Sequence, residues 1–232
     1  MHSYQWIKPL ENRGTSSAIA VNFLYRENLT YVSDNHLTAM WCWLQHEFTK
    51  HQHSIFHIDA HYDTAGHSAL GSVTLPQIRE LDFFGYCSTP HRRDPHSPAF
   101  RWDNYLSIYE HLNRNNIESI FMCTHGVGEE PDFPHKAVKV DMVIDAINNI
   151  ESNGSWIFNL DLDFFVGNNE VRFCKNKRID LYAAISLAVA RSSFCVTTIA
   201  LSPDCVGSWA GAEELLLECC DALGLQLKLP SP

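Results

Sequence analysis

The chain has 232 residues, of which 45% are hydrophobic and 19% charged, and its formal net charge at pH 7 is −10. These proportions indicate a globular protein with a buried core and exclude a disordered or collagen-like chain, and no apolar run reaches the ~20 residues of a membrane span. The negative charge argues against nucleic acid and anionic membranes as partners, because both bind basic surfaces.

Apolar and amphipathic segments alternate along the first half of the chain. Residues 18–24 and 54–59 are apolar runs that predict strands. From His36 onward, apolar side chains recur at helical spacing, and residues 102–112 predict a second helix. The proline-rich segment 84–98 predicts a long loop.

The second half of the chain continues this alternation. We expect strands at 119–123, 156–162 and 195–201, and helices at 141–150, 180–190 and 211–223. Strands that alternate with helices predict an α/β protein with a mainly parallel sheet covered on both faces. Because neither a linker nor a repeat interrupts the pattern, we expect residues 1–232 to form a single domain.

The eight cysteines form no Cys-x-x-Cys pair, so a structural zinc site is not expected. The first residues lack the basic and then apolar layout of a secretory signal, so we expect a cytoplasmic protein. In that compartment, scattered cysteines are usually small buried residues and not disulfides. A nucleophilic cysteine stays open as an alternative, although no motif singles one out.

Two acidic clusters follow apolar strands. Residues 57–63 read His-Ile-Asp-Ala-His-Tyr-Asp, and residues 159–165 read Asn-Leu-Asp-Leu-Asp-Phe-Phe. Alternate side chains of an extended segment point to the same side, so each cluster should gather its polar side chains. The candidate ligands are Asp59, His61, Asp63, Asp161 and Asp163.

Carboxylates gathered on buried strands repel one another unless a cation compensates them. Carboxylate ligands with some imidazole suit Mn(II), and less specifically Zn, Fe, Co or Ni. A single aspartate at a strand end is usually a helix cap or an ion-pair partner. Two clusters with the same spacing favour a metal centre at the carboxyl edge of the sheet. His36, at the start of the first helix, is a further candidate ligand, with a capping or surface role as the alternative.

These segments resemble motifs of the arginase/deacetylase, or ureohydrolase, superfamily. Residues 59–63 are similar to its Asp-Ala-His-x-Asp signature, residues 161–163 to its later Asp-x-Asp, and residues 34–36 to its Gly-Asp-His segment. The resemblance spans residues 33–204 and implies an arginase/deacetylase-like three-layer α/β/α sandwich with a mainly parallel sheet.

Within the superfamily, the chain most resembles the peptide arginases of ribosomal peptide biosynthesis. The resemblance rests on residues 57–63, on residues 159–165 and on Ser202-Pro203-Asp204. It implies that the partner is an arginine-containing precursor peptide, whose arginine side chains are hydrolysed to ornithine with release of urea. The chain has no clear counterpart of the arginase loop that holds a free amino acid, which fits a more open site.

The resemblance also implies two Mn(II) ions. Asp59 and Asp161 would bridge the ions, His36 and Asp63 would complete one position, and His61 and Asp163 the other. Two metals would lower the pKa of a shared water molecule, which then attacks the guanidinium carbon. Asp63 is the candidate that carries the proton to the leaving amine.

A guanidinium substrate needs an opposing carboxylate, because its planar fork binds one in bidentate fashion. Asp204 is the first candidate, since it follows a predicted strand, and Glu213 and Glu129 come next. A helix cap or a turn is the alternative role for Asp204. His125, which follows the strand at 119–123, is a candidate acid/base or substrate contact, with an ordinary surface histidine as the alternative.

Three other functions remain open from the sequence. The chain could be a ureohydrolase of free arginine or another small guanidino compound, a deacetylase-type amidohydrolase, or a metal-containing binding protein without turnover. A complete set of oxygen and nitrogen ligands favours an enzyme over a purely structural site, which is usually closed and richer in cysteine.

Overall fold

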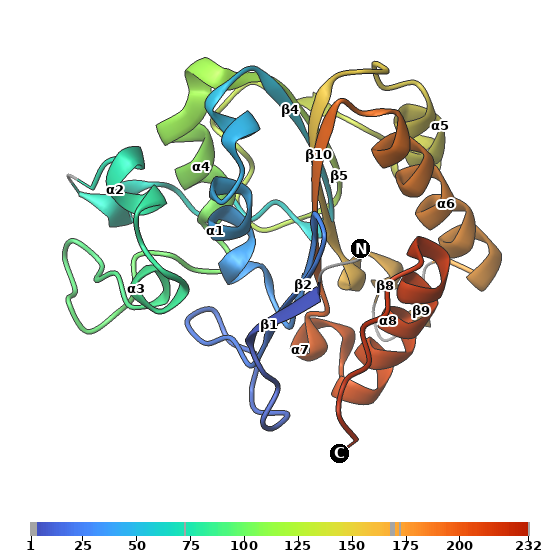
Figure 1. The fold of residues 1–232 in the computed structure, drawn as a ribbon, viewed down its shortest axis with the longest axis horizontal. Helices are drawn as coiled ribbons and strands as arrows, with labels where there is room; N and C mark the ends of the chain where they lie inside the picture. Colours follow the sequence, from blue (N-terminus) through green and yellow to red (C-terminus); the bar gives the residue numbers. More distant parts are fainter. Residues whose placement is uncertain (1–3, 72, 168–169, 172, 232) are drawn as a thin grey trace.

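The computed structural model describes residues 4–231 apart from residues 72, 168–169 and 172. An eight-stranded mixed sheet runs through the centre of the molecule, and helices cover both of its faces (Figure 1). This arrangement confirms the α/β class that the alternating pattern predicts.

The strands of the sheet are β1 (Tyr4–Lys8), β2 (Leu24–Glu27), β3 (Thr30–Ser33), β4 (His53–His61), β5 (Ile117–Val127), β6 (Lys136–Ala137), β7 (Ser155–Asp161) and β10 (Phe194–Ala200). A separate pair is formed by β8 (Val166–Gly167) and β9 (Glu170–Val171). The α-helices are α1 (Ala39–Leu44), α2 (Leu75–Arg79), α3 (Phe83–Cys87), α4 (Tyr105–Asn113), α5 (Val143–Asn148), α6 (Lys175–Arg191), α7 (Pro203–Val206) and α8 (Trp209–Leu223). Two short 3-10 helices, η1 (His36–Thr38) and η6 (Leu162–Phe165), follow β3 and β7.

The strand order is β1-β2-β3-β10-β7-β4-β5-β6. From β3 to β6 every neighbouring pair is parallel, whereas β1 and β2 add to β3 as an antiparallel meander. Parallel strands end at a common edge, so the segments that follow β3, β10, β7 and β4 come together. This edge carries most of the polar residues singled out in the sequence.

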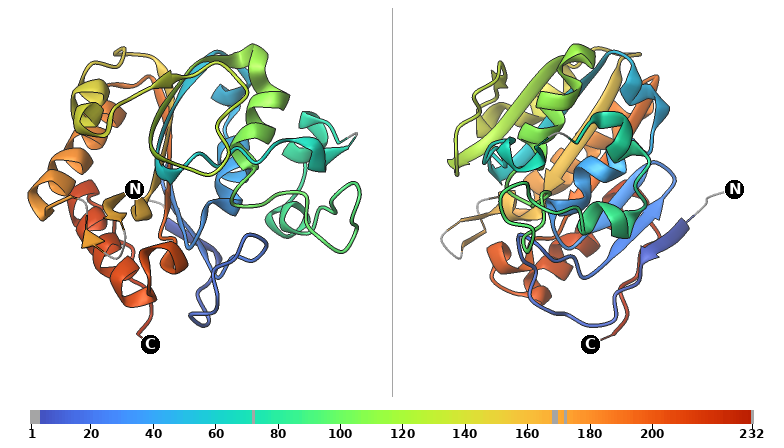
Figure 2. Two further views of the ribbon diagram at one scale, coloured as in Figure 1. Left: turned by 180° about the vertical axis from the view of Figure 1, so that it is seen from behind. Right: turned by 90° about the vertical axis from the view of Figure 1, so that its left-hand side faces the viewer.

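The parallel strands separate two apolar cores. Along β7, Ile157 faces the core beneath α1 and α4, and Phe158 faces the core beneath α5, α6 and α8. Successive side chains of a strand point to opposite faces, which is why a strand buried on both sides is apolar throughout. The side that carries α1 to α4 faces the viewer in the right-hand view of Figure 2.

Most of the predicted elements are confirmed, and the differences have local causes. Residues 18–24 do not form a strand before Leu24, because the backbone amides of Asn22 and Phe23 donate to Asp34 Oδ1, at 2.7 and 3.1 Å, and not to a neighbouring strand. The short strands β1 to β3 have no counterpart in the predicted elements. Part of the predicted loop at 84–98 is helix α3, which Asp82 caps by accepting from the Gly85 amide at 2.7 Å.

Across the described part of the chain, we find no helix with the length and apolarity to cross a membrane.

Replacing Phe158 by alanine should destabilise the fold by about 3–5 kcal/mol, because the ring is 1% exposed and stacks on Phe56. Replacing Phe84, which is 65% exposed, should cost about 1 kcal/mol or less. Urea unfolding followed by circular dichroism measures both changes. Equal losses of stability for the two variants would contradict the assignment of Phe158 to the core.

Candidate metal centre

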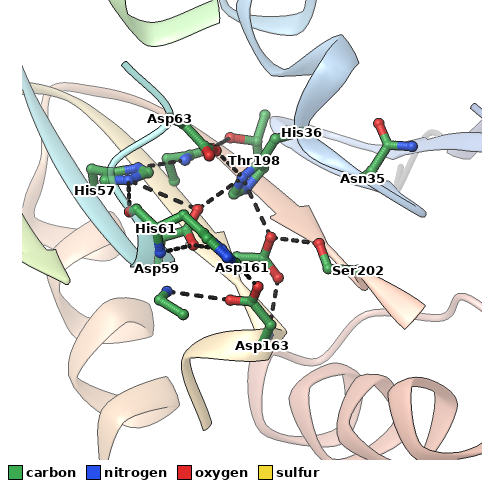
Figure 3. A network of polar contacts seen from close by, with 12 residues as sticks. Asn35, His36, His57, Asp59, His61, Asp63, Asp161, Asp163, Thr198 and Ser202 are labelled. Atoms are coloured by element: carbon green, nitrogen blue, oxygen red, sulfur yellow. Dashed lines mark hydrogen bonds and ion pairs between the residues drawn. The ribbon is translucent and has the colours of Figure 1, made fainter. Parts of the chain in front are cut away.

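The polar residues of the acidic clusters meet at the carboxyl edge of the sheet (Figure 3). Asp59 and His61 lie at the end of β4, Asp161 ends β7, and His36 begins η1 directly after β3. Because β10 and β7 pair with Ala200 opposite Asp161, the segment after β10 reaches the same place. In the sequence these residues lie well over a hundred positions apart, and the parallel topology brings their segments together.

Two histidines interleave with the four carboxylates. His36 Nδ1 lies 3.1 Å from Asp59 Oδ2, 3.0 Å from Asp63 Oδ2 and 3.5 Å from Asp161 Oδ2. His61 Nδ1 lies 3.4 Å from Asp59 Oδ1 and 3.1 Å from Asp163 Oδ2. The two oxygens of Asp59 therefore face different histidines, which is the position of a carboxylate shared between two ligand groups.

The ligand-type atoms fall into two such groups. His36, Asp59 and Asp161 form the first, and His61, Asp163 and Cys205 form the second, with the ligand atoms of each group within 4.8 Å of one another. Asp63 completes the first group through its contact with His36. All six residues predicted as ligands thus share one site, and Cys205 joins them.

The two clusters reach the site through turns, and not entirely through the strand periodicity used in the sequence prediction. Strand β4 ends at His61, and Asp63 takes a left-handed backbone conformation with φ 54°. Asp163 lies in η6, where its amide donates to Asp161 Oδ1 at 2.9 Å. A non-glycine residue in the left-handed region is strained by about 1–3 kcal/mol and is found where its surroundings fix it, often at functional sites.

A buried polar layer supports the ligands from below. Asn159 donates to His57 Nδ1 at 2.9 Å and to the Tyr105 hydroxyl at 2.8 Å, and it accepts from Thr198 at 2.6 Å. Since His57 Nδ1 accepts, its Nε2 donates to the backbone carbonyl of His61 at 3.1 Å. Burial lowers the pKa of His57 to about 4, which keeps the ring neutral in this role. Such outer residues fix the orientation of metal ligands.

The charges of the site depend strongly on one another. Burial raises the pKa of Asp161 and of Asp163, and burial together with the charge of Asp59 raises the pKa of Asp63 to about 7. The neighbouring carboxylates of Asp163 and Asp59 raise the pKa of His61 to about 11. For His36, burial alone would lower the pKa, but the surrounding carboxylates, Asp161 first, raise it. Protons therefore compensate the carboxylates where a cation could.

Two carboxylate oxygens of the site are suited to bind a cation. Asp59 Oδ2 and Asp163 Oδ2 are buried and make no hydrogen bond, although a histidine nitrogen lies 3.1 Å from each. Buried carboxylate oxygens without a partner are costly. Oxygen ligands with imidazole fit a first-row divalent cation, so these residues fit the two metal ions that the sequence prediction places here.

A cavity of about 290 Å³ opens onto the ligands. Its lining includes five of the six predicted ligands, together with Ser202 and Cys205. Away from the ligands, the lining contains Trp102, Asp103 and Glu129, of which Glu129 is exposed and the other two are partly buried. The cavity is therefore acidic, with an indole as its one large aromatic wall among the described lining residues.

Of the three candidate guanidinium partners, the structure brings Glu129 to the cavity. Asp204 is exposed in the first turn of α7, and its side chain is not part of the described lining. Glu213 lies on α8, where it accepts from Arg13 Nε at 2.6 Å. Asp204 therefore follows a strand that ends near the site, as predicted, but its side chain does not line the cavity.

His125 also lies outside the described lining of the cavity. Its Nε2 is 2.9 Å from the carbonyl oxygen of Phe164, and its ring stacks on the Phe164 ring at 4.8 Å.

Three residues of the cavity lining were not predicted as site residues from the sequence, namely Trp102, Asp103 and Cys205. The first two begin a segment predicted as an ordinary helix, and no motif marks Cys205, although it directly follows Ser202-Pro203-Asp204.

Comparisons with known proteins identify no family. No protein-family model matches the chain, and no curated protein is found to be similar to it. Among solved structures, the chain is similar to protein LPL1258 from Legionella pneumophila str. Philadelphia 1, described by family-model DUF519, with 15% identity and a TM-score of 0.41. The similarity covers 81% of this chain and 72% of that chain. Similarity of this degree does not assign a function.

Binding of a divalent cation at neutral pH should release protons. His61, with its pKa raised to about 11, is protonated near pH 7, and Asp63, with its pKa raised to about 7, is about half protonated. A cation competes with these protons for the same atoms, so its affinity should fall as the pH falls through 7. Calorimetric titration with Mn(II) in buffers of different ionisation enthalpy measures the protons released.

The Glu213→Gln variant is the control, because Glu213 pairs with Arg13 away from the ligands and its loss should not change the proton release. A heat of binding that does not vary with the buffer would contradict the assignment of cation binding to His61 and Asp63.

Proposed function

We propose that this chain is a metal-dependent hydrolase of the arginase type, built on a three-layer α/β/α sandwich, that hydrolyses arginine side chains of a precursor peptide to ornithine and urea. The observation that carries the proposal is the convergence of His36 and His61 with four aspartates in two linked groups at the bottom of one acidic cavity. Two ions of Mn(II), or of another divalent metal, would supply an activated water molecule at these groups.

The ligand set favours a two-cation site over a single cation. Asp59 directs one oxygen toward His36 and the other toward His61, and Asp161 and Asp163 extend the two groups from the neighbouring strand. A deacetylase-type amidohydrolase with one zinc ion would not need a second group of ligands beside the first. This supports the arginase-type reaction within the same superfamily.

Asp63 is the ligand carboxylate best placed to move a proton. Its side chain is 10% exposed, against 0% for Asp59 and 5% for Asp161, and it lines the cavity. A group that accepts a proton from the attacking water and donates it to the leaving amine must reach both. Asp63 therefore keeps the role that the sequence prediction gives it.

The cavity suits a guanidinium group. Trp102 and Glu129 both line the cavity, and an aromatic ring and a carboxylate are the groups that bind a planar guanidinium cation. Asp103 is already paired with Arg101 through contacts of 2.9 and 2.6 Å, whereas Glu129 forms no ion pair among the described residues. We therefore assign the guanidinium contact to Glu129.

The charge of the cavity favours an arginine within a peptide over free arginine. The described lining contains no lysine or arginine, and its only cationic groups are the ligand histidines. Free arginine would bring its α-carboxylate into a cavity whose described lining holds carboxylates and no lysine or arginine to pair with it, which costs binding energy. An internal arginine residue carries no such charge. The acidic chain, with a net charge of −10, also favours association with a basic peptide.

An arginine-containing peptide incubated with the protein and Mn(II) should lose the mass of cyanamide for each arginine converted, and urea should appear. The Asp161→Ala variant should abolish both signals, because it removes a carboxylate ligand of the first group. Mass spectrometry of the peptide and a urea assay, with free arginine in parallel, measure the outcome. Urea from free arginine alone would instead indicate a small-molecule ureohydrolase.

Exchange of Glu129 for glutamine should lower kcat/KM for the peptide by roughly 10- to 100-fold, the size expected for the loss of a charge-assisted hydrogen bond. The matched variant Asp204→Asn should retain activity within about twofold, since its exposed side chain lies outside the described lining. Metal content should stay the same in both variants. Loss of activity in Asp204→Asn alone would return the guanidinium contact to Asp204.

A further inference from the structure

Cys205 lies within the candidate metal centre and has no part in the reaction proposed above. Its sulfur belongs to the second ligand group, where it lies within 4.8 Å of the ligand atoms of His61 and Asp163. It also lines the cavity, with Ser202 beside it. The first group contains only nitrogen and oxygen ligands, so the two groups differ in chemical character.

The backbone after β10 directs this thiol toward the site. Ser202 adopts the left-handed conformation, with φ 45° and ψ 55°, and starts the single turn of α7. Its carbonyl accepts from the Cys205 amide at 2.9 Å, while its hydroxyl donates to Asp161 Oδ2 at 2.5 Å. One tight turn therefore brings a hydroxyl to the first group and a thiol to the second.

A second observation points to a ligand at this position, where His61 Nδ1 lies 3.1 Å from Asp163 Oδ2. Asp163 is 2% exposed, and its Oδ2 is buried without a hydrogen bond. A cation between Asp163 Oδ2, His61 Nδ1 and the Cys205 sulfur would satisfy this oxygen, and all three atoms are of ligand type. A disulfide is not the role of this thiol, because Cys205 is a free cysteine.

We propose that Cys205 is a thiolate ligand of the cation held by His61 and Asp163, so that the centre has one position with oxygen and nitrogen ligands and one with a sulfur ligand. The proposal rests on the metal centre of the proposed function. Thiolate ligands select softer cations, and Mn(II) prefers oxygen ligands. The position at His61, Asp163 and Cys205 therefore prefers Zn(II) or Co(II), while the position at His36 accepts Mn(II).

The test is a titration of the metal-free protein with Co(II), followed by ultraviolet and visible absorption. A thiolate bound to Co(II) gives an intense sulfur-to-metal charge-transfer band in the near ultraviolet, whereas oxygen and nitrogen ligands do not. The band should appear with the wild-type protein and be absent from Cys205→Ser. X-ray absorption of the Zn(II)-loaded wild type should show a sulfur neighbour at about 2.3 Å.

Cys174→Ser is the matched control, because Cys174 is the other exposed free cysteine and caps α6 away from the ligands. It should keep the band. The Zn(II) affinity of Cys205→Ser should fall by at least about tenfold, given that even outer partners of metal ligands are worth this much. Circular dichroism confirms that the variant is folded.

The remaining outcomes separate the two proposals. Co(II) binding with identical spectra in wild type, Cys205→Ser and Cys174→Ser would overturn the thiolate ligand and leave the metal centre in place. A wild-type protein that binds no Co(II) would overturn both. A charge-transfer band that disappears in Cys174→Ser and not in Cys205→Ser would show that the sulfur ligand comes from Cys174, and it would overturn the assignment of Cys205 as the thiolate ligand.

Discussion

Four aspartate carboxylates share one largely buried place at the edge of the sheet, and the rest of the site is arranged to compensate them. Asp59, with no exposed surface, lies between His36 and His61 and faces one with each oxygen. The pKa of Asp59 is lowered because the two neighbouring imidazoles outweigh the effect of burial, while the pKa values of Asp161 and Asp163 are raised by burial. Burying carboxylates that carry negative charge side by side costs free energy, and two bound cations would offset this repulsion.

The sheet tolerates these buried carboxylates because they lie at its carboxyl edge, apart from the two apolar cores. Along β7, Ile157 enters one core and Phe158 and Leu160 enter the other, and the strand ends at Asp161. Asn159 marks the boundary, since it ties His57, Tyr105 and Thr198 together beneath the ligands. A fully satisfied polar network of this kind fixes orientation, and a partly satisfied one would destabilise the core. The rigidity of the ligands and the stability of the fold therefore depend on the same layer.

The sequence predicted the parts of the molecule whose pattern is local. β4 and β7 are largely apolar runs that end at ligand residues, so both the strands and the gathering of Asp59 with Asp161 followed from periodicity and parallel topology. What it could not predict depends on turns and on distant contacts. Asp34 holds residues 22 and 23 in a loop that composition alone would make a strand. The positions of Asp204 and Cys205 after β10 do not predict that Asp204 is exposed outside the cavity lining while Cys205 lines the cavity.

Strand β10 differs from β4 and β7 in what it contributes to the site. β4 and β7 supply carboxylates to both ligand groups, whereas the turn after β10 supplies Ser202 to Asp161 and Cys205 to the group of His61. Changes in this turn would alter the character of both cation positions without touching the aspartates. The turn is held by the left-handed conformation of Ser202, by the donation of the Ser202 amide to the Asp34 carbonyl at 2.8 Å and by the burial of Pro203, and none of these depends on the thiol of Cys205. Under the proposed ligand assignment, the metal preference of the second group would depend on the side chain at position 205 and not on the strands of the sheet.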